Sequence, residues 1–150
     1  TKHWINCIKV RRFLMENKIK HLEMIQSIIE KMSRNSFQLK GWTMTLIVAT
    51  VTLSSKDSDR RYILFSIVPA IGFWVLNAYY LMIERKYTEL YDQVRQRSND
   101  EIDFSMKTDH ISENRTKYLK CLFARSNSLF YLTIILSLIV LLFYIKYSSN

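Results

Sequence analysis

Residues 73–98, "FWVLNAYYLMIERKYTELYDQVRQRS", change from apolar to charged with no Gly or Pro between the two halves. Five residues of this stretch recur at steps of three and four positions and therefore share one face of a helix: Asn77, Tyr80, Glu84, Tyr87 and Tyr91. The pattern predicts one helix that spans a membrane over 61–83 and continues into water to residue 97. Such a rod would link a cytoplasmic event to the membrane, although it could also simply end as two solvated turns.

Two further segments are candidates for crossing a bilayer, which requires about 20 mostly apolar residues. Residues 128–147, "SLFYLTIILSLIVLLFYIKY", have no charge before Lys146. The span expected within 35–55 is more polar, because it contains Lys40 and four threonines. Lys40 can extend to the interface beside Trp42, so a crossing there is still expected. The chain has only two Gly and one Pro in 150 residues, and few turn formers favour long helices. We therefore expect an all-α membrane protein with three transmembrane helices.

The distribution of positive charge predicts the orientation. Of 22 Lys and Arg residues, four lie in the connection between the first two spans or at the C-terminal tip: Lys56, Arg60, Arg61 and Lys146. The other 18 lie before the first span or between the second and third, together with 11 of the 13 acidic residues. Since cations accumulate on the cytoplasmic side, we expect a cytoplasmic N-terminus and a periplasmic C-terminus.

Residues 1–34 are predicted to form a long amphipathic cytoplasmic helix. Its apolar residues fall on one stripe at helical spacing: Trp4, Ile8, Met15, Ile19, Leu22, Ile25, Ile29 and Met32. The stripe could pack on the cytoplasmic part of the second span, bundle with copies of itself, or lie on the inner leaflet. The polar face carries both signs of charge, which favours packing within the protein or its oligomer.

Residues 98–127 are expected to form a cytoplasmic loop followed by a basic helix. The loop, 98–114, is polar and mostly acidic, and the segment 115–127, "RTKYLKCLFARSN", is basic. The acidic loop lacks the Gly and the closing Glu of an EF-hand.

The sequence contains no arrangement typical of an enzyme. It has no GxSxG, no Gly-rich phosphate loop and no HExxH. Cys7 and Cys121 lie far apart, and the three histidines share no ligand spacing with them, so no metal site is predicted. We expect neither catalysis nor a cofactor.

Polar residues within the expected spans are candidates for a pore or gate, because such residues usually face a bundle interior or water. The candidates are Thr43, Thr50, Asn77 and Glu84. Threonine can also bond its own helix backbone, so its presence alone does not indicate a pore. Three spans cannot easily enclose a conduit, so we expect a cyclic homo-oligomer, for example a tetramer.

The cytoplasmic part has a net charge of about +7 from its 18 cations and 11 acids. An assembled basic ring could bind phosphates, and tyrosines could stack on bases. The candidate ligand-binding residues are Arg85, Lys86, Arg95, Arg97, Lys117, Lys120, Arg125, Tyr87 and Tyr91. The simpler interpretation is that these cations contact anionic lipid headgroups at the inner membrane.

Two segments carry a family resemblance: "NSFQLKGWTMTL", 35–46, and "FWVLNAYYLMIERKYTELYDQVR", 73–95. They resemble small bacterial membrane proteins with the pattern N-S-F-x-L-K-G-W followed by F-W-x-L-(D/N)-x-Y-Y-L-x-x-E-R-x-(F/Y)-x-x-L-Y-D-x-V-R. The positions that match are Lys40, Gly41, Trp42, Asn77, Tyr79, Tyr80, Glu84, Arg85, Tyr91, Asp92 and Arg95. Asn77 stands where the family more often has Asp, so a charge-dependent gating role does not carry over to it.

The family is similar to the membrane effectors of Hailong-type anti-phage systems. This resemblance implies an oligomeric inner-membrane channel that depolarises the host in abortive infection. It also implies gating by a nucleotide or oligonucleotide signal made by a nucleotidyltransferase partner. The alternative is a non-conducting membrane scaffold or anchor that recruits a soluble partner through the N-terminal helix.

Overall fold

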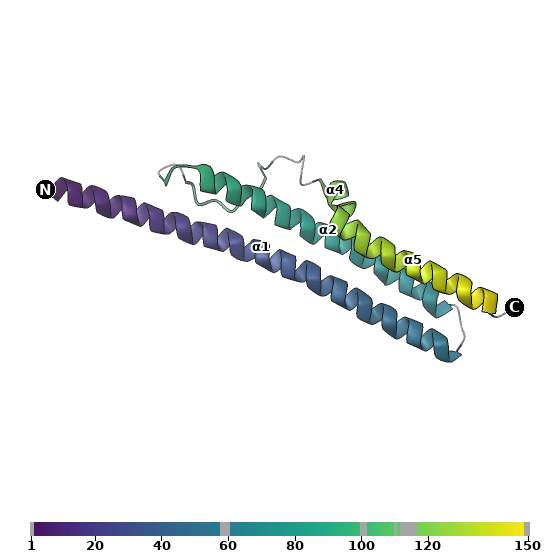
Figure 1. Cartoon of the computed structure of the whole chain (residues 1–150). Helices are drawn as coiled ribbons and strands as arrows, with labels where there is room; N and C mark the ends of the chain where they lie inside the picture. The colour runs from purple at the N-terminus through teal and green to yellow at the C-terminus, as the bar shows by residue number, and fades with distance from the viewer. Residues whose placement is uncertain (1, 58–60, 100–101, 110, 112–116, 149–150) are drawn as a thin grey trace.

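The computed structural model describes residues 2–57, 61–99, 102–109, 111 and 117–148. Within these residues the regular structure is helical, and its main elements are α1 (Lys2–Asp57), α2 (Arg61–Gln96), α4 (Tyr118–Leu122) and α5 (Arg125–Ser148). The expected all-α class is therefore confirmed. α1 and α2 form a long antiparallel pair, and α5 lies along the N-terminal half of α2 (Figure 1).

α1 is one uninterrupted helix of 56 residues, about 84 Å long at 1.5 Å per residue. The segments expected at 1–34 and 35–55 thus belong to a single rod. Nothing in the sequence breaks it, because it contains no Pro, and Gly41 is the one Gly within its bounds. The apolar stripe of residues 1–34 and the more apolar C-terminal segment are therefore held in one fixed rotational register.

α2 also runs without interruption, from Arg61 to Gln96, and contains Pro69. The apolar and charged halves of residues 73–98 therefore belong to one helix almost to its end. α4 is only five residues long, and the chain turns at Phe123 and Ala124 before α5 begins. The basic helix expected at 115–127 is thus divided into α4 and the first turn of α5. Of the segment 98–116, residues 100–101, 110 and 112–116 lie outside the described residues.

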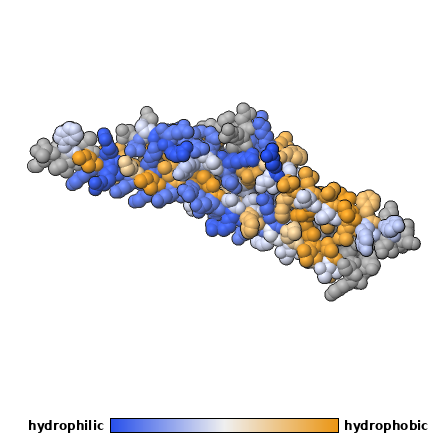
Figure 2. Space-filling view, in the orientation of Figure 1, coloured by the Kyte–Doolittle hydropathy of each residue, from blue (hydrophilic) through white to orange (hydrophobic). Residues whose placement is uncertain are grey.

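Apolar side chains collect on the surface at one end of the molecule, over the region that contains α5, while the opposite part is mostly hydrophilic (Figure 2). On α5, Leu136, Val140 and Phe143 are 61–67% exposed. α2 and α5 are each long and apolar enough to cross a membrane. Water would disfavour so large an apolar surface on a monomer, whereas lipid would not. Residues 36–55 of α1 are less apolar, because of Lys40 and the threonines. Among the described residues, length and hydropathy together give candidate spans on α2 and α5 and none on α1.

Two clusters of buried residues hold the helices together. Ile25, Leu90, Val94 and Ile111 form the first cluster, which joins α1, α2 and the segment after α2. The second, in the apolar region, joins α1 and α2 to α5: Ile134 and Leu138 pack against Ile47, Val51 and Ile67, among others.

Replacing Ile25 by Ala should weaken the first cluster, because its side chain is fully buried. We expect a loss of about 2–5 kcal/mol in the free energy of unfolding. The control is Met24→Ala, whose side chain is 56% exposed, with an expected change of about 0.5 kcal/mol or less. Unfolding of the detergent-purified variants measures both values, and equal losses would contradict this packing.

Candidate functional site

The junction between α4 and α5, residues 117–128, is attached to α2 by side-chain hydrogen bonds; we call it the elbow. The indole Nε1 of Trp74 donates to the carbonyl of Leu122 at 3.0 Å. The hydroxyl of Tyr118 donates to the carbonyl of Val75 at 2.7 Å. Since these contacts join residues more than 40 positions apart in the sequence, they fix where the chain turns relative to α2.

Asn77 and Asn127 form the centre of the elbow. Nδ2 of Asn77 donates to Oδ1 of Asn127 at 2.7 Å, and both side chains are 1% exposed. Nδ2 of Asn127 in turn donates to the carbonyls of Cys121 and Leu122 at 3.3 and 3.2 Å. The turn takes these carbonyls out of a continuous helix, where an unpaired carbonyl beside an apolar region would cost free energy. Asn127 therefore adds to the other donors at these carbonyls: the N–H of Ala124 at Cys121, and Trp74 and the hydroxyl of Ser128 at Leu122. The two asparagines therefore stabilise the break.

Aromatic packing closes the elbow on its apolar side. Tyr131, fully buried, stacks on Trp74 at 6.3 Å between ring centroids, and Phe123 meets the same indole edge to face at 6.1 Å. From α1, the ammonium of Lys40 lies 5.8 Å from the ring centroid of Phe130, within the range of a cation–π contact. All three long helices therefore contribute to this region.

The four pore or gate candidates occupy different environments. Thr43 is 1% exposed, and its hydroxyl donates to the carbonyl of Leu39 at 2.7 Å. Thr50 is half-buried and bonds its own helix backbone. Asn77 belongs to the elbow, and Glu84 lines a pocket beside it. Thr43 and Asn77 are thus packed inside the single chain.

A different face of α1 presents small and polar residues outward: Gly41, Thr45, Ala49 and Thr52 are exposed. They recur at steps of four, four and three residues, a helical spacing that is visible in the sequence and that the predicted pore candidates do not include. Both hydroxyls donate to their own helix, to the carbonyls of Gly41 and Val48. Each oxygen retains acceptor capacity for water or for a neighbouring chain.

A hollow of about 510 Å³ lies between α2 and α4, near the elbow; we call it the boundary pocket. Its lining residues are Leu81, Glu84, Arg85, Thr88, Glu89, Asp92 and Lys120. The lining combines three carboxylates with two cations, and Asp92 also pairs with Arg95. An Nη of Arg85 also donates to Sγ of Cys121 at 3.6 Å, which holds the guanidinium toward α4.

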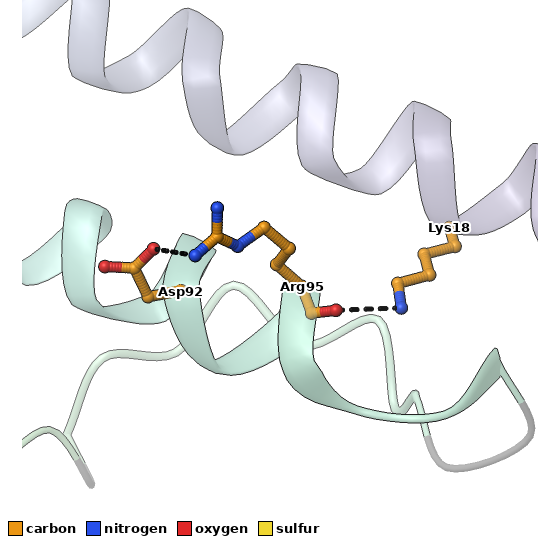
Figure 3. A network of polar contacts seen from close by, with 3 residues as sticks. All are labelled: Lys18, Asp92 and Arg95. Atoms are coloured by element: carbon orange, nitrogen blue, oxygen red, sulfur yellow. Dashed lines mark hydrogen bonds and ion pairs between the residues drawn. The ribbon is translucent and has the colours of Figure 1, made fainter.

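The other candidate ligand-binding residues are dispersed. Arg95 pairs with Asp92 at 3.6 Å on an exposed surface, and Lys18 Nζ donates to the carbonyls of Arg95 and Arg97 at the end of α2 (Figure 3). A cation at a helix C-terminus is favoured by the helix dipole. Arg97, Lys117, Lys120 and Arg125 are exposed and Lys86 is half-buried. Arg85 and Arg95 lie about 15 Å apart along α2 by helical rise.

Tyr87 and Tyr91 are not free to stack on a base. Both are half-buried and pack against the first cluster, around Ile25 and Leu90. A single chain therefore does not assemble the predicted cations and tyrosines into one phosphate-binding site.

The segment after α2 folds back over α1 at His21. The imidazole is 4% exposed, meets Phe104 edge to face at 5.6 Å, and has no hydrogen-bond partner for Nε2. Burial lowers the pKa of His21 from its ordinary value of 6.5, and the nearby Asp103 carboxylate partly opposes this shift. His21 is therefore neutral beneath the loop at neutral pH.

Burial also raises the pKa of the Cys121 thiol, and Arg85 partly opposes the shift. The thiol is fully buried in the elbow, which makes it a packing residue and not a nucleophile. Within the described part of the chain, no three His, Cys, Asp or Glu side chains are arranged to hold a metal ion.

Comparisons of the chain with protein-family models, curated proteins and solved structures gave no match. The family resemblance therefore rests on the motifs at 35–46 and 73–95.

Replacing Asn127 by Leu should destabilise the elbow, because Asn77 and the carbonyls of Cys121 and Leu122 lose a buried partner. We expect the free energy of unfolding to fall by about 2–3 kcal/mol. The neighbouring exposed Ser126, changed to Ala, provides the control. Thermal unfolding of both variants in detergent decides the point: an Asn127→Leu variant as stable as the control would show that the elbow does not depend on this side chain.

Acidification should loosen the loop over His21. Because the folded-state pKa lies below 6.5, the contribution of neutral His21 to stability is complete above that value and declines as the pH falls below it. Limited proteolysis near residues 102–109 should therefore accelerate between about pH 7.5 and about pH 5.5. His21→Phe keeps an aromatic partner for Phe104 and should show a weaker pH dependence; identical profiles would exclude His21 as the cause.

Proposed function

We propose that this protein is an oligomeric membrane protein that conducts ions when a cytoplasmic signal acts on its α1–α2 stalk. The observation that carries the proposal is the continuity of α1 and α2 from the hydrophilic region to the apolar region. Two helices without a hinge transmit a tilt or rotation from one end to the other. The first cluster of buried residues joins them in the hydrophilic part, where a signal would act.

The contacts of α1 with α5 support a third membrane span. Ile47 and Val51 of α1 pack in the second cluster with Ile134 and Leu138 of α5. If α5 crosses the bilayer, these α1 residues lie in hydrocarbon at the same depth. Lys40, near Phe130 at the start of α5, then lies close to the lipid–water boundary, where a lysine can reach water. The excess of cations at the other end favours a cytoplasmic stalk and a periplasmic C-terminus.

A conduit would require several copies, since side chains of the second cluster fill the space among the three helices. The outward face of α1 with Gly41, Thr45 and Thr52 is the best candidate to line it or to join copies. Small residues allow close helix approach in membranes, and threonine hydroxyls can coordinate water. A cyclic homo-oligomer, with a tetramer as a simple case, would place one such face from each copy around the axis.

The resemblance of residues 35–46 and 73–95 suggests the biological setting: depolarisation of the bacterial inner membrane in response to a nucleotide or oligonucleotide during phage infection. Phosphates would contact exposed cations such as Arg97, Lys117 and Arg125, drawn from more than one copy because one chain does not group them. The signal shifts the closed–open equilibrium only if it binds one state more tightly.

Changing both Thr45 and Thr52 to Leu should reduce conduction, because an apolar constriction disfavours water and ions. Potassium efflux and membrane potential of cells that express the protein measure this, and we expect a loss of about tenfold, which corresponds to about 1.4 kcal/mol in the barrier. Thr133→Leu is the matched control, since Thr133 is exposed on α5. Cells that retain full membrane potential with wild-type protein, or equal effects of all variants, would contradict the proposal.

A scaffold is the second candidate, and one observation favours it. Because Lys18 caps the end of α2, residues 2–17 of α1 extend beyond α2 (Figure 1). Trp4, Ile8 and Met15 are 49–74% exposed there and line a hollow of about 270 Å³ with two arginines. A soluble acidic partner could bind this apolar and basic surface. A scaffold would leave the membrane sealed, so the efflux measurement also distinguishes the two functions.

A further inference from the structure

The boundary pocket is placed where a lipid headgroup would lie. Its lining begins at Leu81, near the end of the apolar part of α2, and continues to Asp92, with Lys120 contributed by α4. We propose that this pocket binds the headgroup of a zwitterionic phospholipid with a primary ammonium group, that is, a phosphatidylethanolamine. The proposal rests on the placement of α2 and α5 in a membrane and does not require that the protein conducts ions.

The order of the lining residues along α2 matches the order of the groups in such a lipid. Leu81 lies nearest the apolar region, Arg85 follows about 6 Å further along the helix, and Glu89 about 6 Å beyond that. From acyl chain to headgroup, the lipid presents glycerol, phosphate and then ammonium. The guanidinium of Arg85 and the ammonium of Lys120 suit the phosphate, and the carboxylates of Glu89 and Asp92 suit the ammonium.

The charge of the pocket selects a zwitterion over an anion. Glu84, Glu89 and Asp92 line the pocket together with Arg85 and Lys120, and Arg95 pairs with Asp92 at 3.6 Å. Carboxylates and cations therefore lie side by side, and a ligand with phosphates alone would pair with the cations and be repelled by the carboxylates. A phosphatidylethanolamine supplies one charge of each sign and can pair with both halves of the pocket. The same argument makes the boundary pocket a poor site for the nucleotide signal.

The chemistry of the lining also selects ethanolamine over choline. A primary ammonium has three N–H donors for carboxylates and for the hydroxyl of Thr88, whereas trimethylammonium has none. Choline headgroups are typically recognised by aromatic rings, and none of the described lining residues is aromatic. Progressive methylation of the amine should therefore weaken binding.

A bound lipid would also connect α2 to the elbow, because Lys120 belongs to α4 and Arg85 contacts Cys121 of the same helix. The headgroup would then bridge α2 and α4, which are separated by residues 97–117 in the chain, and it would add to the hydrogen bonds of Trp74 and Asn77. Lipid composition would thereby influence the stability of the elbow.

The test uses the full-length protein purified from a membrane that contains equal amounts of phosphatidylethanolamine, phosphatidylcholine and phosphatidylglycerol. Mass spectrometry of the intact protein counts the retained lipids. We expect wild type to retain ethanolamine lipid over choline lipid by about tenfold, the factor that one charge-assisted hydrogen bond supplies. Glu89→Gln combined with Asp92→Asn should reduce this ratio toward one. Glu23→Gln, at an exposed position on α1, is the control and should leave it unchanged.

A second measurement needs no variant and so does not depend on variant folding. Wild-type protein is offered ethanolamine lipids with zero, one, two or three N-methyl groups, and retention should decrease with each methyl. Equal retention across the series, or a preference for phosphatidylglycerol, would overturn the proposal. Ion flux in the same preparation is measured separately. Flux without lipid selectivity would reject the lipid site but not the proposed channel. Lipid selectivity without flux would support the lipid site and reject the channel.

Discussion

The packing of α1 against α2 is the contact on which the rest of the structure depends. Neither helix has another partner of comparable length among the described elements, and most of the stability of a helix in a protein comes from packing of its apolar face. The seam begins where Lys18 caps the end of α2 and continues through Ile25 to the buried Thr43. Because it crosses from the hydrophilic to the apolar part of the molecule, one interface fixes the register of both.

The elbow adds α5 to this pair by a different kind of interaction. In the hydrophilic region the chain is held by apolar burial around Ile25, Leu90 and Ile111. At the start of α5 it is held by donors, Trp74, Asn77 and Asn127, directed at backbone carbonyls and at one another. A membrane would favour this division, because hydrocarbon weakens the drive to bury apolar side chains and increases the cost of an unpaired carbonyl. The polar residues of the elbow stabilise the fold of the single chain.

Much of the fold could be predicted from the sequence because helix continuity depends on local residues. The absence of Gly and Pro from 73–98 predicted an α2 that continues past the apolar region, and the stripe of the N-terminal arm predicted the face that carries Leu22, Ile25 and Ile29. The partner of that stripe was one of three alternatives, and the structure shows that its central part packs on α2 and on the segment after it. The short α4 was harder to predict from the sequence, because the turn at Phe123 depends on side chains of α2 that are distant in the chain.

The site was harder to predict, because it depends on which way residues face. Thr43 and Thr45 are two positions apart, yet one is buried and the other exposed, and only the direction of the α1 seam distinguishes them. The Asn77–Asn127 pair joins residues 50 positions apart, which no local pattern reveals. The sequence indicated a group of cations near Arg85, but it did not show that Glu84, Glu89 and Asp92 line the same pocket.

The central claim is that α1 is a single straight rod that joins the hydrophilic stalk to the apolar region. The most direct test is the distance between spin labels placed at the exposed positions 13 and 48, in protein reconstituted into bilayers with both cysteines replaced. A continuous helix predicts a narrow distribution centred at about 52 Å, from 35 residues at 1.5 Å each. A broad distribution, or one centred well below that distance, would show that the helix bends or breaks between stalk and membrane and would contradict the account.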